Sequence, residues 1–220
     1  MKKKPFLLLP LLILIFNSCI GISADIQMRR DGSFRLVLEY RISRMAETIG
    51  RLDGNEIWQF IPTGRADFER TIARIDGVRL VSFSSRERTG DIVNNITLDF
   101  KDAQALLNFL DPQGRRASIN REDSLNRLNI ILNEPVSSEI NTDLMNLFRQ
   151  AAVGYNVRIS FSAEGQSSMM LTDGAGKTIT PPPQAEVVLS GRNVSLEIET
   201  AEILGLKEGL GVVFAYTVPR

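Results

Sequence analysis

The feature that most constrains the fold is an alternation of apolar and polar residues on both sides of a single turn. Apolar side chains occupy every second position from Ile22 to Met28, and again from Phe34 to Ile42. A period of two is typical of strands that have one buried and one solvated face. Between the two runs, Asp31-Gly32 favours the positive φ of a tight turn. The sequence therefore predicts an antiparallel hairpin here.

The rest of the chain gives further hairpins and several short helices. Strands are predicted at 78–86 and 92–100, within 116–132 around a turn near Glu122-Asp123, at 155–163, at 185–189 and 194–198, and at 212–218. Helical spacing predicts helices at 64–76, 101–110 and 138–153, with another short one near 201–204. Because hairpins connect the strands, we expect an α+β fold. It would be a mainly antiparallel sheet built from successive hairpins, with three short helices on one face.

An apolar leader precedes the first predicted strand. Three lysines are followed by an uncharged stretch that ends at Ser18, and the next residue, Cys19, is the only cysteine of the 220 residues. A basic start, an apolar stretch and a small residue at its end are typical of a secretory signal. The run is too short for a membrane-spanning helix, which needs roughly 20 residues. We therefore divide the chain into a signal peptide, 1–18, and a single extracytoplasmic domain, 19–220.

The end of this leader, Phe16-Asn17-Ser18-Cys19, resembles the lipobox of bacterial lipoproteins. The resemblance implies cleavage before Cys19 and acylation of that residue with chains such as palmitate. The first two residues depart from the commonest lipobox. An ordinary signal peptide cleaved after Ala24, where Ile22 is large for its position, and an uncleaved anchor are the alternatives. In bacteria with two membranes, Ile20 after the cysteine permits export to the outer membrane.

The leader, the strand Ile22–Met28 and the turn at Asp31-Gly32-Ser33 together resemble the start of the LppM-like family of bacterial lipoproteins. The resemblance covers about the N-terminal quarter of the chain and implies a β-rich lipid-binding domain. Members of that family often have a C-terminal membrane helix. No second apolar run of spanning length occurs in this sequence, so no such helix is expected. The acylated Cys19 is the one residue that the resemblance transfers.

Composition limits the chemistry available to the domain. The absence of histidine excludes Ser-His-Asp and Cys-His catalysis, His-ligated zinc and the usual general base near neutral pH. A single cysteine excludes an intramolecular disulfide and a CxxC pair. The predicted signal removes three of 26 basic residues, which leaves a net charge of −3 and no electrostatic basis for nucleic-acid binding. We therefore expect no enzymatic activity, no cofactor, no metal and no nucleic-acid partner.

Three short patterns suggest sites, and a structural interpretation is preferred for each. Asp173–Thr178 ends in the Gly-Lys-Thr of a P-loop, but Leu171 replaces the first glycine and prolines follow, which favours a loop tip. Glu197 and Glu199 share one side of a strand, as carboxylates on solvated faces do. Arg86-Glu87-Arg88 mixes charges, which favours a solvated surface over an anion site.

Two apolar clusters leave alternatives open. Trp58, the only tryptophan, either belongs to a flap over the core or contacts lipid or a ligand. Met169-Met170-Leu171 is either an adaptable contact surface or an ordinary packed strand, and we prefer the strand.

These features predict a membrane-anchored bacterial lipoprotein of the cell envelope, facing the periplasm in a cell with two membranes, that acts as a non-enzymatic interaction or structural module. The alternative is a carrier or sensor of a lipid or other apolar ligand, bound between sheet and helices. A hydrolase without histidine is a third hypothesis. The expected partners are the membrane, through acyl chains on Cys19, and a lipid or an envelope protein. The short spacing to the first strand would hold the domain within roughly 10 Å of the lipid surface.

Overall fold

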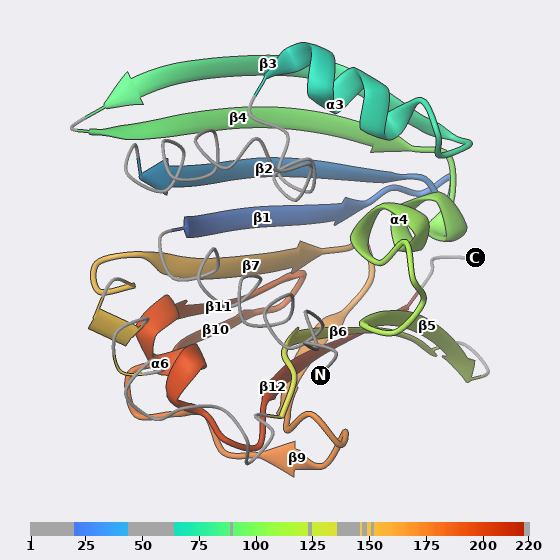
Figure 1. The fold of residues 1–220 in the computed structure, drawn as a ribbon. Helices are drawn as coiled ribbons and strands as arrows, with labels where there is room; N and C mark the ends of the chain where they lie inside the picture. Colours follow the sequence, from blue (N-terminus) through green and yellow to red (C-terminus); the bar gives the residue numbers. More distant parts are fainter. Residues whose placement is uncertain are drawn as a thin grey trace, which may run out of the picture.

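The computed structural model describes residues 20–43, 64–88, 90–122, 125–135, 146, 149–150 and 152–217. Within these ranges the chain forms two β-sheets and a few short helices (Figure 1). The larger sheet contains β1 (Ile20–Met28), β2 (Phe34–Ser43), β3 (Val78–Arg88), β4 (Asp91–Phe100), β7 (Asn156–Ser162), β10 (Glu186–Ser190) and β11 (Asn193–Glu199). The smaller sheet contains β5 (Ala117–Glu122), β6 (Leu125–Asn133), β8 (Ser167–Thr172), β9 (Thr178–Ile179) and β12 (Leu210–Thr217). The helices are α3 (Arg65–Ile72), α4 (Ala103–Leu110) and α6 (Thr200–Gly205).

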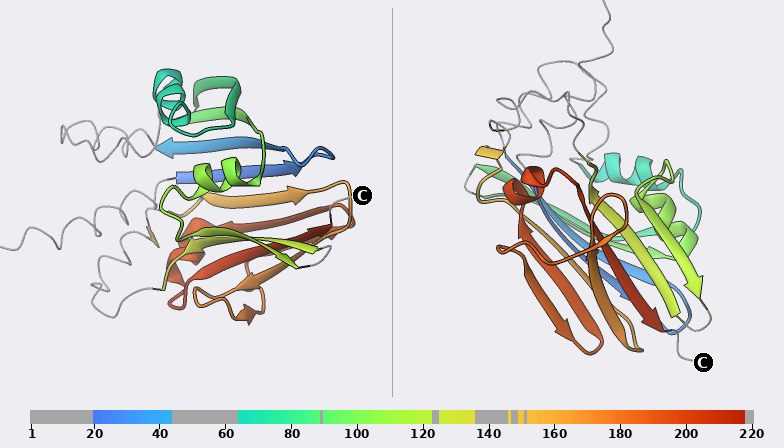
Figure 2. Two further views of the ribbon diagram at one scale, coloured as in Figure 1. Left: turned by 90° about the vertical axis from the view of Figure 1, so that its right-hand side faces the viewer. Right: turned by 90° about the horizontal axis from the view of Figure 1, so that it is seen from below.

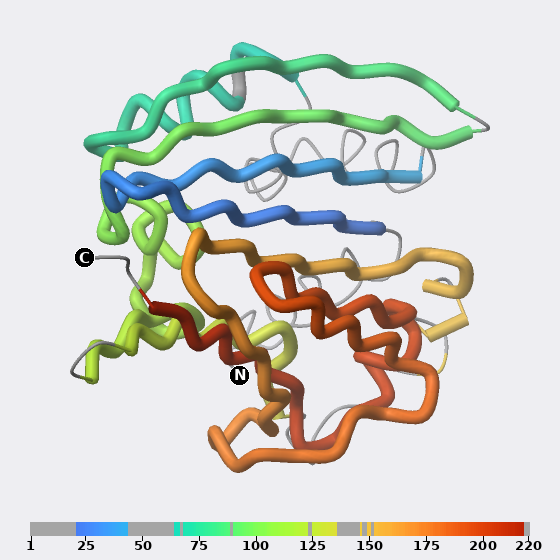
Figure 3. Tube along the Cα trace, turned by 180° about the vertical axis from the view of Figure 1, so that it is seen from behind, coloured from blue at the N-terminus to red at the C-terminus, as the bar shows by residue number. Residues whose placement is uncertain are grey.

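The strand order is β10-β11-β7-β1-β2-β4-β3 in the seven-stranded sheet and β5-β6-β12-β8-β9 in the five-stranded sheet. Figure 3 shows the run from β3 through β4, β2 and β1 to β7 across the molecule. Among the described strands, β1 and β7 pair in parallel, and the other pairs are antiparallel. The expected α+β character with mainly antiparallel sheet is therefore confirmed at this coarse level.

The first predicted hairpin is present and starts two residues earlier than expected. β1 and β2 pair from Ile20 with Ile42 to Met28 with Phe34. Gly32 in the turn has φ +81°, and the Asp31 carboxylate accepts hydrogen bonds from the N–H and the hydroxyl of the next residue but one. The alternating pattern therefore gives the larger sheet one apolar face, here called the inner face, and one polar outer face.

The inner face is covered by the smaller sheet and by the helices, which lie on the same side of the larger sheet (Figure 2). Phe161 of β7 stacks on Phe214 of β12, with ring centroids 5.3 Å apart. Further along the sheet, Phe68 of α3 stacks on Tyr40 of β2 at 6.2 Å. Aromatic side chains thus join all the layers into one core.

The second sheet corrects the prediction of a single sheet with helices on one face. The chain leaves the larger sheet after β4, and α4 leads into the β5–β6 hairpin. It returns as β7, crosses at 163–166 into β8, and crosses again through α6 from β11 to β12. Most of the strands alternate with period two, whereas β12 is an apolar run buried along nearly its whole length. Neither pattern says which sheet a strand joins.

The helices also differ in part from the prediction. The predicted 64–76 helix ends at Ile72, because the following residues form turns that lead to Gly77 at φ +80°. The helix predicted at 138–153 falls largely outside the described residues, of which Asn146, Arg149 and Gln150 are helical. None of the helices in the described ranges is both long and apolar enough to cross a bilayer.

Candidate functional site

Arginines gather at two opposite ends of the polar outer face of the larger sheet. At the end where β3 begins, the Asp99 carboxylate accepts hydrogen bonds from Arg29 at 2.7 Å and from Arg35 at 2.8 and 3.1 Å. Arg79 of β3 donates a further bond at 2.7 Å. These guanidinium groups, Arg35 first, lower the pKa of Asp99 to about 2. All three arginines are therefore held by one carboxylate, which ties the first turn, β2, β3 and β4 together.

At the other end, three arginines surround a hollow with a volume of about 320 Å³. Val93 of β4, which is 3% exposed, forms its floor. The register places Arg41 of β2 and Arg86 of β3 on either side of Val93. We call this surface the arginine hollow. It is lined by Glu39, Arg41, Arg86, Arg88 and Val93.

A buried carboxylate fixes one wall of the arginine hollow. Asp91, only 6% exposed, accepts a hydrogen bond of 2.7 Å from Arg41 Nε and one of 3.1 Å from the Tyr155 hydroxyl. The guanidinium of Arg41 also lies 5.4 Å from the centre of the Tyr155 ring. The ion pair and the cation–π contact hold Arg41 in one orientation, so this wall is preorganised.

The other two arginines of the hollow, Arg86 and Arg88, form weaker ion pairs or none with the described residues. Arg86 is 63% exposed, and its nearest carboxylate, that of Glu39, is 4.0 Å away. Arg88 forms no ion pair with the described residues. Guanidinium groups bind phosphate and carboxylate through paired N–H donors, so the hollow has the chemistry of an anion site.

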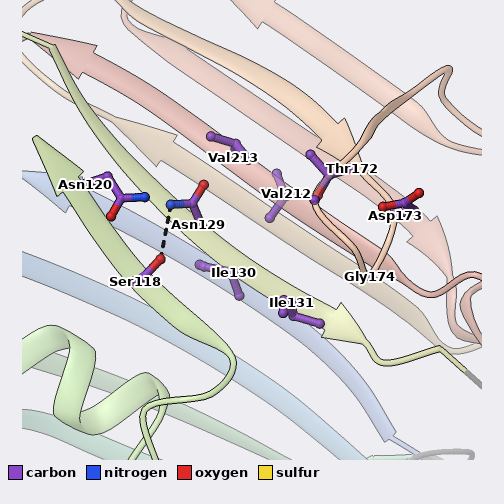
Figure 4. A pocket seen from close by; sticks show the side chains of 11 residues that line it. Ser118, Asn120, Asn129, Ile130, Ile131, Thr172, Asp173, Gly174, Val212 and Val213 are labelled. Atoms are coloured by element: carbon purple, nitrogen blue, oxygen red, sulfur yellow. Dashed lines mark hydrogen bonds between the residues drawn. The ribbon is translucent and has the colours of Figure 1, made fainter. Parts of the chain in front are cut away.

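A second hollow, of about 210 Å³, lies on the smaller sheet (Figure 4). Polar side chains of β5 and β6 line one side, where the Asn129 amide donates to the Ser118 hydroxyl at 3.2 Å. The β8–β9 turn forms its rim. The hollow is lined by Ser118, Asn120, Asn129, Ile130, Ile131, Thr172, Asp173, Gly174, Gly176, Val212 and Val213.

That turn contains the Gly-Lys-Thr pattern, and its geometry explains why it is not a P-loop. The Asp173 carboxylate accepts the N–H groups of Ala175 and Lys177, both at 2.9 Å. The two glycine amides of the turn donate to backbone carbonyls at 2.8 and 3.0 Å. A P-loop needs these amides for phosphate, followed by a helix, whereas strand β9 follows here. The predicted loop tip is confirmed.

The other candidates from the sequence analysis that fall on described residues do not line either hollow. Glu197 accepts a hydrogen bond from the Asn156 amide at 2.9 Å, and Glu199 accepts one from the Gly154 N–H at 2.8 Å, both on the outer face. In the Met169–Leu171 segment, the first and last residues are buried in β8, as the strand interpretation predicts. Within the described ranges, no group of three or more acidic or cysteine side chains is placed to hold a metal ion. Cys19 and Trp58 lie outside the described residues.

A buried amide on the inner face was not anticipated. Asn94 of β4 is fully buried opposite Tyr40 of β2 and Ser85 of β3. Neither its amide nitrogen nor its amide oxygen has a hydrogen-bond partner in the described structure. Buried polar groups are nearly always paired, so such a group requires an explanation.

The arginine hollow was also missed, although a signal was present. The mixed charges of Arg86-Glu87-Arg88 favour a solvated surface, yet in a strand the two arginines point to one face and the glutamate to the other. The two-residue period of a strand could therefore have predicted that Arg86 and Arg88 lie on one face of β3, with Glu87 on the opposite face. Only the pairing of β2, β4 and β3 brings Arg41 to the same place.

Comparison with solved structures finds a likeness to the folded domain of the Mycobacterium tuberculosis LppM protein, determined by NMR. The two chains are 10% identical with a TM-score of 0.42, over 92% of this chain and 91% of that one. No protein-family model matches the chain, and no curated protein sequence matches it. At this identity and TM-score, the likeness establishes neither a family nor a function.

Proposed function

We propose that the protein is a lipid-anchored module of the bacterial cell envelope, which binds a partner and catalyses no reaction. Acyl chains on Cys19 would hold it in the membrane, in the outer membrane if the cell has two. The absence of histidine and the position of Glu197 and Glu199 on the outer face, where each accepts an exposed hydrogen bond of its own, support a binding role rather than a catalytic one.

The observation that carries the proposal is the position of the first strand. β1 begins at Ile20, directly after the cysteine of the lipobox-like segment, and is paired on both sides by β2 and β7. An anchor on residue 19 would therefore be connected to the core of the larger sheet without an intervening linker. Such an anchor fixes the distance of the domain from the membrane and restricts its orientation.

Metabolic labelling tests this proposal. Cells that express the full chain are grown with a palmitate analogue, and the protein is recovered from the membrane fraction. We expect label on the wild-type chain and none on Cys19→Ala. Since a single acyl chain gives only marginal membrane binding, stable retention requires a second acyl chain or a basic surface that also contacts the membrane. An unlabelled wild-type chain, or one recovered as a soluble species, contradicts the anchor.

A second candidate function, carriage of a lipid or other apolar ligand, is favoured by Asn94. An unpaired, fully buried amide on the mainly apolar inner face would suit a ligand that has one polar group and an apolar body. Native mass spectrometry of the Cys19→Ala protein purified from cells tests this function. A lipid that co-purifies with it, and is lost in Asn94→Leu, would support the carrier; protein without bound lipid would contradict it.

A further inference from the structure

We infer that the arginine hollow binds the phosphate groups of anionic phospholipids in the membrane that holds the chain. This inference deepens the proposed function and rests on it, because acylation of Cys19 is what would bring this surface to a membrane. The occupant is thus a headgroup of the anchoring bilayer. Three features support this occupant: the position of the hollow, its charge, and the guanidinium donors of Arg86 and Arg88, which carboxylates of the described residues hardly use.

The hollow lies at the end of the larger sheet where the chain enters it. β1 begins at this end, β2 and β3 finish there, and β4 starts there (Figure 1, left). Gly21 pairs with Arg41. Paired Cα atoms are about 5 Å apart, so Arg41 lies beside the second residue of β1, at the point where the described chain begins. An anchored Cys19 would therefore hold the hollow at the headgroup layer.

The charge of the hollow is complementary to such a headgroup. Among the described residues, three guanidinium groups line it against one carboxylate, that of Glu39. The buried Asp91 beneath lowers the local charge to +1, but it also orients Arg41. Arg86 and Arg88, on the same face of β3, are the less engaged donors. Because phosphate accepts paired N–H donors from guanidinium, it is the group that these two side chains fit best.

The floor and the size of the hollow agree with this occupant. Val93 provides an apolar base beneath the arginines, which excludes water from one side of an ionic hydrogen bond and strengthens it. The volume of about 320 Å³ is at the lower end of the range typical of small-molecule sites, roughly 300–1,000 Å³.

The arginine cluster at the opposite end of the sheet provides a matched reference. Its three arginines all bind Asp99, and it lies far along the strands from Ile20. Arg79, 74% exposed, and the exposed Arg74 next to the start of β3 carry the same charge as Arg86 and Arg88. Replacing either pair changes the net charge equally, so only position and environment differ.

Vesicle binding tests the inference. The domain 19–220 with Cys19→Ala is mixed with vesicles of phosphatidylcholine alone, or with vesicles that also contain phosphatidylglycerol, and bound protein is measured by sedimentation. We expect binding that requires phosphatidylglycerol. Arg86→Gln/Arg88→Gln should weaken it about tenfold or more, since each arginine at an anionic surface contributes measurably. Arg74→Gln/Arg79→Gln should change it less than about twofold if position decides.

Each of the other possible outcomes contradicts a specific part of the inference or of the proposed anchor. Equal loss in the two double variants would mean that net charge, not the hollow, attracts the vesicles. Equal binding to both kinds of vesicle, or none, refutes the inference even if wild-type Cys19 carries label. If Cys19 is unlabelled while the selective binding persists, the anchor fails and the headgroup site remains. A single cooperative thermal transition in both double variants confirms that they are folded; Arg74→Gln/Arg79→Gln should unfold at a slightly lower temperature, because it loses the Arg79–Asp99 ion pair.

Discussion

At the scale of single residues, the two ends of the outer face use the same side chains for different purposes. Around Asp99 the guanidinium groups converge on one carboxylate that is 10% exposed. Around the arginine hollow, only Arg41 is held in this way, by Asp91. Arginine is therefore structural where a buried carboxylate accepts several of its donors, and available for a ligand where it does not.

The Asp99 cluster gives a prediction for acid stability. Its pKa of about 2 is below the ordinary 3.8, so its stabilisation is present above about pH 4 and is lost as the pH falls towards 2. The full shift corresponds to about 2 kcal/mol, which solvent screening of the exposed arginines reduces towards about 1 kcal/mol. We expect Asp99→Asn to lose about 1–2 kcal/mol at pH 7, and the difference from wild type to disappear near pH 2.

Urea unfolding of the Cys19→Ala protein between pH 7 and pH 2 measures this difference. Asp76→Asn serves as the control, because Asp76 is exposed in the turn after α3. It should unfold like its parent at every pH. A pH-independent difference between Asp99→Asn and its parent would show that the loss comes from packing instead of charge.

At the scale of elements, the turns decide where strands and helices end. Gly77, at φ +80°, leads from α3 into β3, and a Cβ placed there would lie 3.1 Å from the Lys101 Cβ and 3.3 Å from the Ala105 Cβ. Gly32, at φ +81° in the first hairpin, has open space around it. The two glycines thus share a backbone conformation but not an environment.

This difference predicts unequal costs for the same substitution. Gly32→Ala should destabilise the protein by about 1 kcal/mol, the usual cost of a left-handed conformation for a residue with a side chain. Gly77→Ala should cost about 2 kcal/mol, because α4 must also shift away from β3. Thermal or urea unfolding measures both. Equal losses would mean that the contact with α4 relaxes without cost.

At the scale of the whole molecule, the two sheets share one core. Phe161 on the larger sheet contacts both Phe214 and Tyr216 on the smaller sheet, with ring centroids 5.3 and 4.9 Å apart. Burial between the sheets raises the pKa of Tyr216 to about 12. Because the core is continuous, we expect the sheets to unfold together.

Phe161→Ala tests that expectation. Removing a fully buried phenylalanine should cost about 3–5 kcal/mol, and the remaining transition should still be single. Phe83→Ala, at a half-buried position on the edge strand β3, should cost less. Far-UV and near-UV circular dichroism in urea should give coincident transitions. Two separate transitions would show that the sheets are independent units.

The sequence by itself determined the local elements of the described part. The alternation at Ile22–Ile42 and the turn glycine specify the first hairpin, and similar patterns specify the β3–β4 and β10–β11 hairpins, because each depends on neighbours in the sequence. Only the tertiary structure decided the division into two sheets, the parallel pairing of β1 with β7 and the meeting of Arg41 with Arg86 across Val93. These depend on long-range burial, which a period-two pattern satisfies equally well in either sheet.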